Sequence, residues 1–245
     1  MFWALPLLAV WIRWSPPGKG SIPLGAVLGC GLLFAGDLSF WHWSILNTSV
    51  ANATLLANFA PLVVVFGAWF WLRERVTKRF LAGMALALAG SAVLLGHSAT
   101  LGERFVRGDV YGLITALFFG SYVLMLARAR STAPAAGLMF YSSAITCVAM
   151  ALFAASAGES LFPETTRGWV VLIGLAWLSQ VAGQGLIAYA LGYLPASLSS
   201  LVILVEPLSA AIFGWVLLDE RLAALQWLGA VAIVAGILVA RRPAG

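Results

Sequence analysis

The stretch SVANATLLANFAPLVVVFGAWFWLRERVTKRFLAGMALALAG, residues 49–90, decides the fold because a related stretch occurs a second time. Residues 195–236 read PASLSSLVILVEPLSAAIFGWVLLDERLAALQWLGAVAIVAG and align with it without gaps, at an offset of 146 residues. Ten of the 42 aligned pairs are identical, and they include Pro, Trp, Glu, Arg and Gly. Chance matches between two apolar helices would be mostly Ala, Leu and Val, so the chain contains an internal repeat.

The composition around the repeat is that of a membrane protein. Of the 245 residues, 62% are hydrophobic and 9% are charged, whereas soluble domains carry about 25% charged residues. A water-soluble fold of this length could not bury so much apolar surface. This excludes a cytosolic enzyme, a nucleic-acid-binding protein and a secreted disulfide scaffold. The net charge of +5 is therefore attributed to Lys and Arg in cytoplasmic loops.

Eight apolar runs are long enough to cross about 30 Å of hydrocarbon as helices. They span approximately residues 22–46, 48–72, 79–96, 109–127, 133–157, 168–192, 195–218 and 223–240. A ninth run, residues 1–12, would rise only about 18 Å as a helix, so we expect a span that lacks its outer end. The sequence predicts an all-α integral membrane protein with about nine transmembrane helices.

The two copies of the repeat are expected to cross the membrane in opposite directions. The matched spans, 48–72 and 195–218, are the third and the eighth, and an odd number of crossings separates them. Inverted repeats of this kind are typical of secondary transporters. We expect two halves, residues 1–96 and 109–241, in an inverted plan of five plus five helices whose first helix is missing from this chain.

The loops indicate the orientation. Ten Lys and Arg residues fall on one side of the predicted spans and four on the other. Because cytoplasmic loops carry the excess of Lys and Arg, the C-terminus is expected to be cytoplasmic. The cluster RERVTKR at residues 73–79 is expected to be a solvated cytoplasmic turn.

The stretches FAGDLSFWHWSILNTSVANATLLANFAPLVVVFGAWFWLRERV (34–76) and LPASLSSLVILVEPLSAAIFGWVLLDERL (194–222) resemble the EamA branch of the drug/metabolite transporter superfamily. In both halves a helix with small residues and proline leads to a turn, LRER or LDER, and then to a Gly-rich helix. The resemblance implies a ten-helix carrier of the bacterial inner membrane with both termini cytoplasmic. This chain departs from that plan by lacking the first helix. The substrates of the family range from amino acids and other metabolites to drugs.

Two carboxyl groups fall within predicted spans, where ionisable residues are costly and usually face an interior cavity. Asp37 lies past the middle of run 22–46, and Glu206 lies at the centre of run 195–218. Each would serve as a proton relay or as the partner of a cationic group on a solute. The structural alternative is a carboxyl group hydrogen-bonded to a neighbouring helix.

Proline and amide side chains complete the candidate site. Pro61 and Pro207 occupy equivalent places in the two copies, where each removes a backbone donor and produces either a gating bend or a static kink. Asn58 and Gln184 also lie within spans, and both would be expensive facing lipid. They are expected either to hydrogen-bond the solute or to join neighbouring helices.

The sequence predicts a secondary transporter that moves a small organic metabolite or drug-like solute by alternating access, most simply outward. The alternative is a truncated or helper membrane protein without transport activity of its own. No enzyme is expected, because GxSxG, HExxH and Walker A motifs are absent from the sequence. Two histidines and two separate cysteines predict no metal site, and no cofactor is expected. The expected partners are the solute and the lipid bilayer, while glycine faces such as Gly25 and Gly29 would pack within one chain or in a homodimer.

Overall fold

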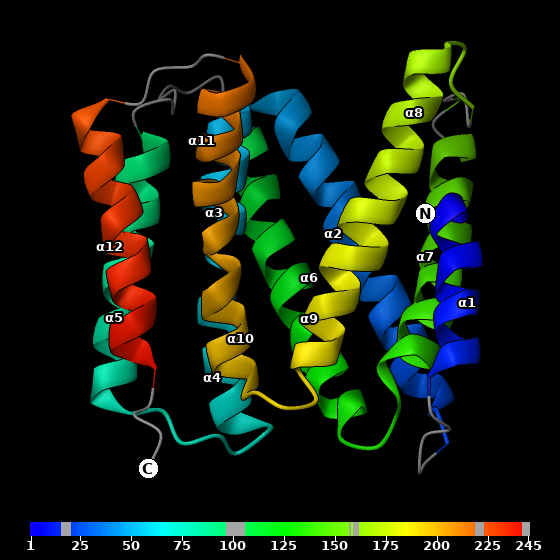
Figure 1. Cartoon of the computed structure of the whole chain (residues 1–245), viewed down its shortest axis with the longest axis horizontal. Helices are drawn as coiled ribbons and strands as arrows, with labels where there is room; N and C mark the ends of the chain where they lie inside the picture. Colours follow the sequence, from blue (N-terminus) through cyan, green and yellow to red (C-terminus); the bar gives the residue numbers. More distant parts are fainter. Residues whose placement is uncertain (16–20, 97–105, 157, 159–161, 219–222, 242–245) are drawn as a thin grey trace. The chain divides into compact units, whose positions relative to one another are not determined.

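The computed structural model describes residues 1–15, 21–96, 106–156, 158, 162–218 and 223–241, and every secondary-structure element in these ranges is helical (Figure 1). The elements are η1 (Phe2–Ala4), α1 (Leu5–Trp14), α2 (Leu24–Asn47), α3 (Val50–Ala57), α4 (Ala60–Phe70), α5 (Lys78–Gly96), α6 (Val106–Arg130), α7 (Ala135–Ser156), α8 (Thr166–Gly174), η3 (Leu175–Gln184), α9 (Gly185–Ala190), α10 (Ala196–Ile203), α11 (Val205–Leu218) and α12 (Ala224–Ala240). The segment η3 is π-helical.

Seven helical stretches in the described part of the chain are long and apolar enough to cross a membrane. They are Leu24–Asn47, Val50–Phe70, Lys78–Gly96, Val106–Arg130, Ala135–Ser156, Thr166–Ala190 and Ala196–Phe213. Two further apolar helices, Phe2–Trp14 and Ala224–Ala240, are shorter. The predicted all-α membrane fold is confirmed, whereas the count of nine transmembrane helices stays a prediction.

The chain forms two compact units, and each combines segments from both halves of the sequence. The first unit consists of Met1–Gly36 and Tyr122–Leu194. The second unit consists of Asp37–Ser121 and Pro195–Gly245. Two of the boundaries fall inside α2 and α6, and the third falls between Leu194 and Pro195, just before α10. The predicted halves at 1–96 and 109–241 describe a relationship between sequences and stay a prediction.

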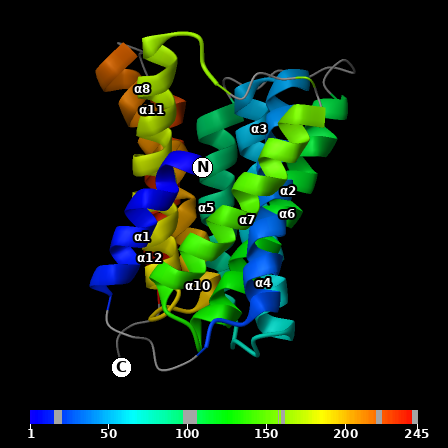
Figure 2. The same ribbon diagram turned by 90° about the vertical axis from the view of Figure 1, so that its right-hand side faces the viewer.

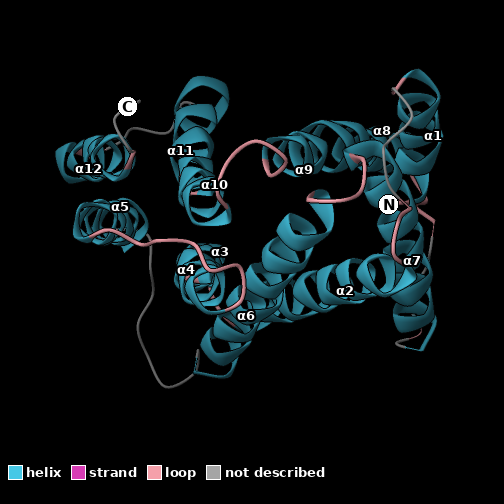
Figure 3. Cartoon of the chain, turned by 90° about the horizontal axis from the view of Figure 1, so that it is seen from below, coloured by secondary structure: helices cyan, strands magenta, loops and turns pink. Residues whose placement is uncertain are grey.

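The core of the second unit contains the closely packed pair α5 and α12, which lie side by side in Figures 1 and 3. A Cβ atom added to Gly90 would lie 2.7 Å from the carbonyl oxygen of Gly229, and Gly83 approaches Gly236 in the same way. The contacts therefore run in opposite directions along the two helices. Since the two helices carry aligned segments of the repeat, the matched segments are antiparallel, as expected of an inverted repeat.

The two spans that the repeat relates are interrupted at matching positions. The helix α3 ends before Asn58 and Phe59, and α10 ends before Leu204, which is the residue aligned with Asn58 at the offset of 146. The physical cause is the proline that follows each break. Pro61 and Pro207 have no backbone N–H to donate to the carbonyl four residues earlier, and their rings disfavour a continuous helix there.

The first unit is held together by small residues and by hydrogen bonds inside the bundle. A Cβ atom on Gly31 would lie 2.5 Å from the Cβ atom of Ile145, so α2 and α7 pack closely at this point. Beside this contact, the Thr146 hydroxyl donates to the carbonyl oxygen of Gly31 at 2.9 Å. At another contact of this unit, the Trp177 indole donates to the Trp3 carbonyl oxygen at 3.1 Å.

Candidate functional site

The two carboxyl groups predicted from the sequence both belong to the second unit. Asp37 on α2 is 7% exposed, and Glu206, the second residue of α11, is exposed. Their charges are near enough to interact electrostatically. The second unit thus contains one buried and one accessible carboxyl group on two different spans. This arrangement suits the binding of a cation or the transfer of a proton between the two groups.

The position of Asp37 follows from the packing of α2 against α6, whose ribbons lie side by side in Figures 2 and 3. Ser44 on α2 donates from its hydroxyl to the carbonyl oxygen of Gly108 on α6 at 2.8 Å. The Phe40 ring stacks on Phe118 of α6, with the ring centroids 5.4 Å apart. Asp37 precedes Phe40 by three residues and Ser44 by seven, so all three share one face of α2. That face is the one directed at α6.

Asn58 lies at the interruption between α3 and α4. Its side-chain amide is buried and donates to the hydroxyl of Ser91 on α5 at 3.2 Å. This bond ties the interrupted span to the helix beside it. The contact corresponds to the structural alternative for Asn58, and a role in solute binding stays a proposal.

Gln184 belongs to the first unit, unlike the other candidate residues. It ends the π-helical segment η3, is half-buried, and accepts a weak hydrogen bond of 3.5 Å from the Tyr122 hydroxyl. In the same segment the buried Gln180 donates to the Ser143 hydroxyl of α7 at 2.9 Å. π-Helical turns within α-helices are frequent at functional sites. The two glutamines therefore differ, since Gln180 joins two helices through a short bond and Gln184 does not.

A carboxylate that the sequence analysis placed in a solvated turn instead caps a helix. Glu74 accepts hydrogen bonds from the backbone N–H of Ala196 at 2.7 Å, and from the backbone N–H and hydroxyl of Ser197 at 3.2 and 2.6 Å. It thereby satisfies the free donors at the first turn of α10 and complements the helix dipole. Arg73, in the left-handed backbone region with φ of 56°, turns the chain so that Glu74 reaches this position. Glu74 is half-buried at this cap, and the cytoplasmic location of the turn at 73–79 stays a prediction.

A second carboxylate is tied to the start of the other interrupted span. Asp109 in the first turn of α6 accepts from the Thr48 hydroxyl at 2.8 Å and from the Asn52 amide at 3.2 Å. The start of α3 is the equivalent of the start of α10 in the repeat. Each interrupted span therefore has its N-terminal end bonded to a carboxylate from another helix or turn. In the sequence, Glu74 is marked as a structural residue by its identity in both copies of the repeat. Asp109 lies outside the repeat and has no comparable mark.

Two buried hydroxyl groups in the second unit have no hydrogen-bond partner within the described residues. They belong to Thr115 on α6, which is 2% exposed, and to Ser199 on α10, which is 7% exposed. Most buried polar side chains in proteins are paired, so each exception calls for an explanation. Neither residue stands out in the sequence, because isolated hydroxyl residues are common in apolar helices.

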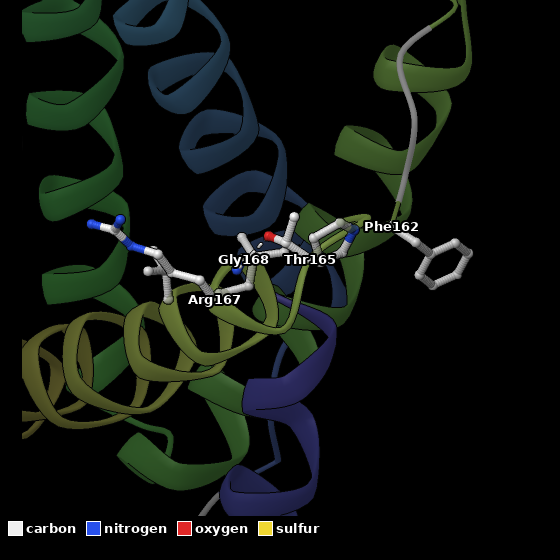
Figure 4. A pocket seen from close by; sticks show the side chains of 7 residues that line it. Phe162, Thr165, Arg167 and Gly168 are labelled. Carbon is white, nitrogen blue, oxygen red and sulfur yellow. Dashed lines mark hydrogen bonds between the residues drawn. The ribbon is translucent and has the colours of Figure 1, made fainter.

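A surface pocket of about 560 Å³ lies in the first unit at the beginning of α8 (Figure 4). The Thr165 hydroxyl caps the helix by accepting from the backbone N–H of Gly168 at 3.1 Å. Figure 4 shows the Arg167 and Phe162 side chains pointing in opposite directions, away from this cap. None of the predicted site residues lines the pocket. It lacks the convergent polar groups of a binding site, and we do not assign it a function.

Comparison with known proteins identifies the family. The EamA-like transporter family matches residues 1–96 and 106–242. A probable amino-acid metabolite efflux pump of Escherichia coli (strain K12) is 31% identical over 245 residues, covering 90% of this chain and 78% of the relative. An uncharacterized transporter of Archaeoglobus fulgidus is 26% identical over 199 residues, covering 81% of this chain and 70% of the relative.

A solved structure, titled only as a crystal structure of protein, has a TM-score of 0.76 and 20% sequence identity. The match covers 97% of this chain and 82% of that one, and it supports the fold alone. The family and the names of the relatives point to a transporter and not to an enzyme. The resemblance seen at residues 34–76 and 194–222 is confirmed, and the chain belongs to the EamA-like transporter family of membrane transporters.

Proposed function

We propose that this carrier exports small amino-acid metabolites across a bacterial-type inner membrane by alternating access. The observation that carries the proposal is that Asp37 and Glu206 both lie on apolar helical spans of the second unit, where their charges are near enough to interact. A carboxylate is a strong partner for the ammonium group that such metabolites carry. The printed name of the Escherichia coli relative, an amino-acid metabolite efflux pump, supports this class of solute.

The mechanism follows from the interrupted spans. In our proposal the solute ammonium group binds between Asp37 and Glu206, while the breaks at Asn58 and Leu204 allow the following helices to tilt. Pro61 and Pro207 keep these breaks open. Gln184 of the first unit is proposed as a further polar residue on the path of the solute. Rocking of the two inverted halves, 1–96 and 109–241, would expose this site to each side in turn. The proposed arrangement also has nine spans, a cytoplasmic C-terminus and a homodimer.

The test is an efflux assay with purified protein in liposomes. The liposomes are loaded with the twenty common amino acids and, in a parallel set, with their N-acetyl derivatives, and the released solutes are identified by mass spectrometry. We expect release of amino acids but not of N-acetyl derivatives, which lack the ammonium group. Glu206→Gln and Asp37→Asn should each lower the rate at least tenfold, which is the loss of one charged hydrogen bond. The matched control is Glu164→Gln, which changes an exposed carboxyl group in the loop before α8.

Three outcomes decide between the readings. Unchanged release in Glu206→Gln and Asp37→Asn would make both carboxyl groups structural. Equal release of the N-acetyl derivatives would contradict recognition of the ammonium group. If the wild-type protein releases nothing, the result contradicts the export proposal. It favours the alternative of a membrane protein without transport activity of its own.

A further inference from the structure

Thr115 lies in the middle of α6 and carries a hydroxyl group without a hydrogen-bond partner within the described residues. The side chain is 2% exposed, so bulk water does not satisfy it. Buried threonines in helices commonly return this hydroxyl to a carbonyl oxygen of the preceding turn. A buried hydroxyl without any partner is unfavourable. The Thr115 hydroxyl is therefore a candidate hydrogen-bond partner for a bound solute.

The face of α6 on which Thr115 lies is fixed by its neighbours in sequence. Tyr111 and Phe118 are each about one helical turn away, and both rings lie against Phe40 of α2, with centroids 6.0 and 5.4 Å from it. Residues three and four apart share a helix face. Thr115 is therefore on the side of α6 directed at α2, which is also the side that Asp37 faces.

The height of Thr115 along the bundle follows from two glycines of α6. A Cβ atom on Gly112 would lie 2.9 Å from the Cβ atom of Leu56, and one on Gly120 would lie 2.7 Å from the Cβ atom of Val63. Thr115 lies between these two contacts and is thus level with the interruption at Asn58. On the α2 side it is level with Phe40. Asp37 is three residues from Phe40, about 5 Å along the helix axis.

We infer that Thr115 binds the solute beside Asp37, its hydroxyl donating a hydrogen bond to the carboxylate of an α-amino acid. This rests on the proposed function, in which Asp37 and Glu206 receive the ammonium group. The ammonium and carboxylate groups of an α-amino acid are attached to the same carbon atom, so their partners must lie close together. Thr115 and Asp37 are within about one turn of each other on facing helix surfaces, which meets this requirement.

The test compares Thr115→Val, which removes the hydroxyl at nearly constant volume, with Thr115→Ser, which keeps it. Efflux of each released amino acid is measured in liposomes over a range of internal concentrations, and the corresponding amino-acid amides serve as solutes without a carboxylate. Thr115→Val should raise the KM for amino acids about tenfold, as expected for a hydrogen bond to a charged group. Thr115→Ser should stay within about twofold of wild type, and the KM for the amides should change little in either variant.

Thermal unfolding separates this role from a structural one. Removing an unpaired buried hydroxyl should leave the Tm of Thr115→Val at or above that of wild type. The matched control is Thr146→Val, because the buried Thr146 hydroxyl has acceptors, with its oxygen 2.9 Å from the carbonyl oxygen of Gly31 and 3.0 Å from that of Ser142. That control should lower Tm and leave KM unchanged.

Each outcome decides the inference. An unchanged KM in Thr115→Val, with active wild type, would overturn the role of Thr115 and leave the export proposal intact. A fall in Tm with an unchanged KM would make Thr115 a packing residue. If wild type releases none of the amino acids, the proposed solute class fails, and the inference fails with it.

Discussion

Gly90 and Gly229 each lie against the backbone of the other, since a Cβ atom on either would be 2.7 Å from the carbonyl oxygen of its partner. The contact is reciprocal, and it joins α5 and α12, which carry aligned segments of the repeat. Side-chain-free positions on both helices let the two backbones approach, as is common in membrane helix pairs. The same pattern at Gly83 and Gly236 shows that the glycines conserved between the two copies pack against each other.

Gly90→Ala and Gly229→Ala should each destabilise the protein by about 1–3 kcal/mol, because the new methyl group meets backbone atoms that cannot move aside. The measurement is the Tm of the purified protein in detergent. Gly25→Ala is the control, since a Cβ atom there would meet nothing within 4 Å. Equal Tm values for all three variants would show that the helices are not in close contact at these glycines.

Glu74 and Ser197 should be energetically coupled. Glu74→Gln weakens three hydrogen bonds at the start of α10, and Ser197→Ala removes one of them. We expect a loss of about 1–3 kcal/mol for Glu74→Gln, because hydrogen bonds to a charged group are stronger than average. In a double-mutant cycle followed by thermal unfolding, the interaction energy should reach at least about 0.5 kcal/mol. Strict additivity would mean that the bond contributes nothing to stability.

Pro61→Ala and Pro207→Ala should slow transport while preserving or raising stability. Each restores a backbone donor at the break in an interrupted span and favours a continuous helix. If the breaks act as hinges, the rate of amino-acid efflux should fall several-fold in each variant without loss of Tm. Pro134→Ala, in the turn before α7, is the matched control outside these spans. Wild-type rates in Pro61→Ala and Pro207→Ala would identify static kinks.

Gln180 and Gln184 should separate into a structural residue and a transport residue. Gln180→Leu breaks the buried bond to Ser143 and should cost about 0.6 kcal/mol, typical of hydrogen bonds between membrane helices. Gln184→Leu removes only the long contact with Tyr122, so Tm should change less while the KM for efflux rises. If KM changes only in Gln180→Leu, Gln180 would be the transport residue and Gln184 the structural one.

Much of the architecture was predictable because apolar run length and the repeat depend on local sequence. The runs at 22–46 and 109–127 correspond to α2 and α6, and the paired prolines mark the interruptions in the two related spans. The candidate carboxyl groups were predictable for the same reason, since charge within an apolar run is visible without any structure.

The partners of these side chains were not predictable. Glu74 lies 122 residues from Ala196, and Asp109 lies 61 residues from Thr48. Bonds between residues so far apart in the chain cannot be predicted from the local sequence pattern. The π-helical form of residues 175–184 depends on packing and has no local signature comparable to proline. Thr115 could be identified as a candidate site residue only from the structure, which shows that its hydroxyl has no partner within the described residues and how α6 is aligned with α2.

The cap that Glu74 provides for α10 has a consequence for biosynthesis. The acceptor is synthesised 122 residues before the donors that it satisfies, so α10 leaves the ribosome with its first backbone donors unpaired until it meets a residue made much earlier. The second half of the chain thus completes its folding on the first. A second half expressed alone should therefore lack this cap, and co-expression of the first half should restore it.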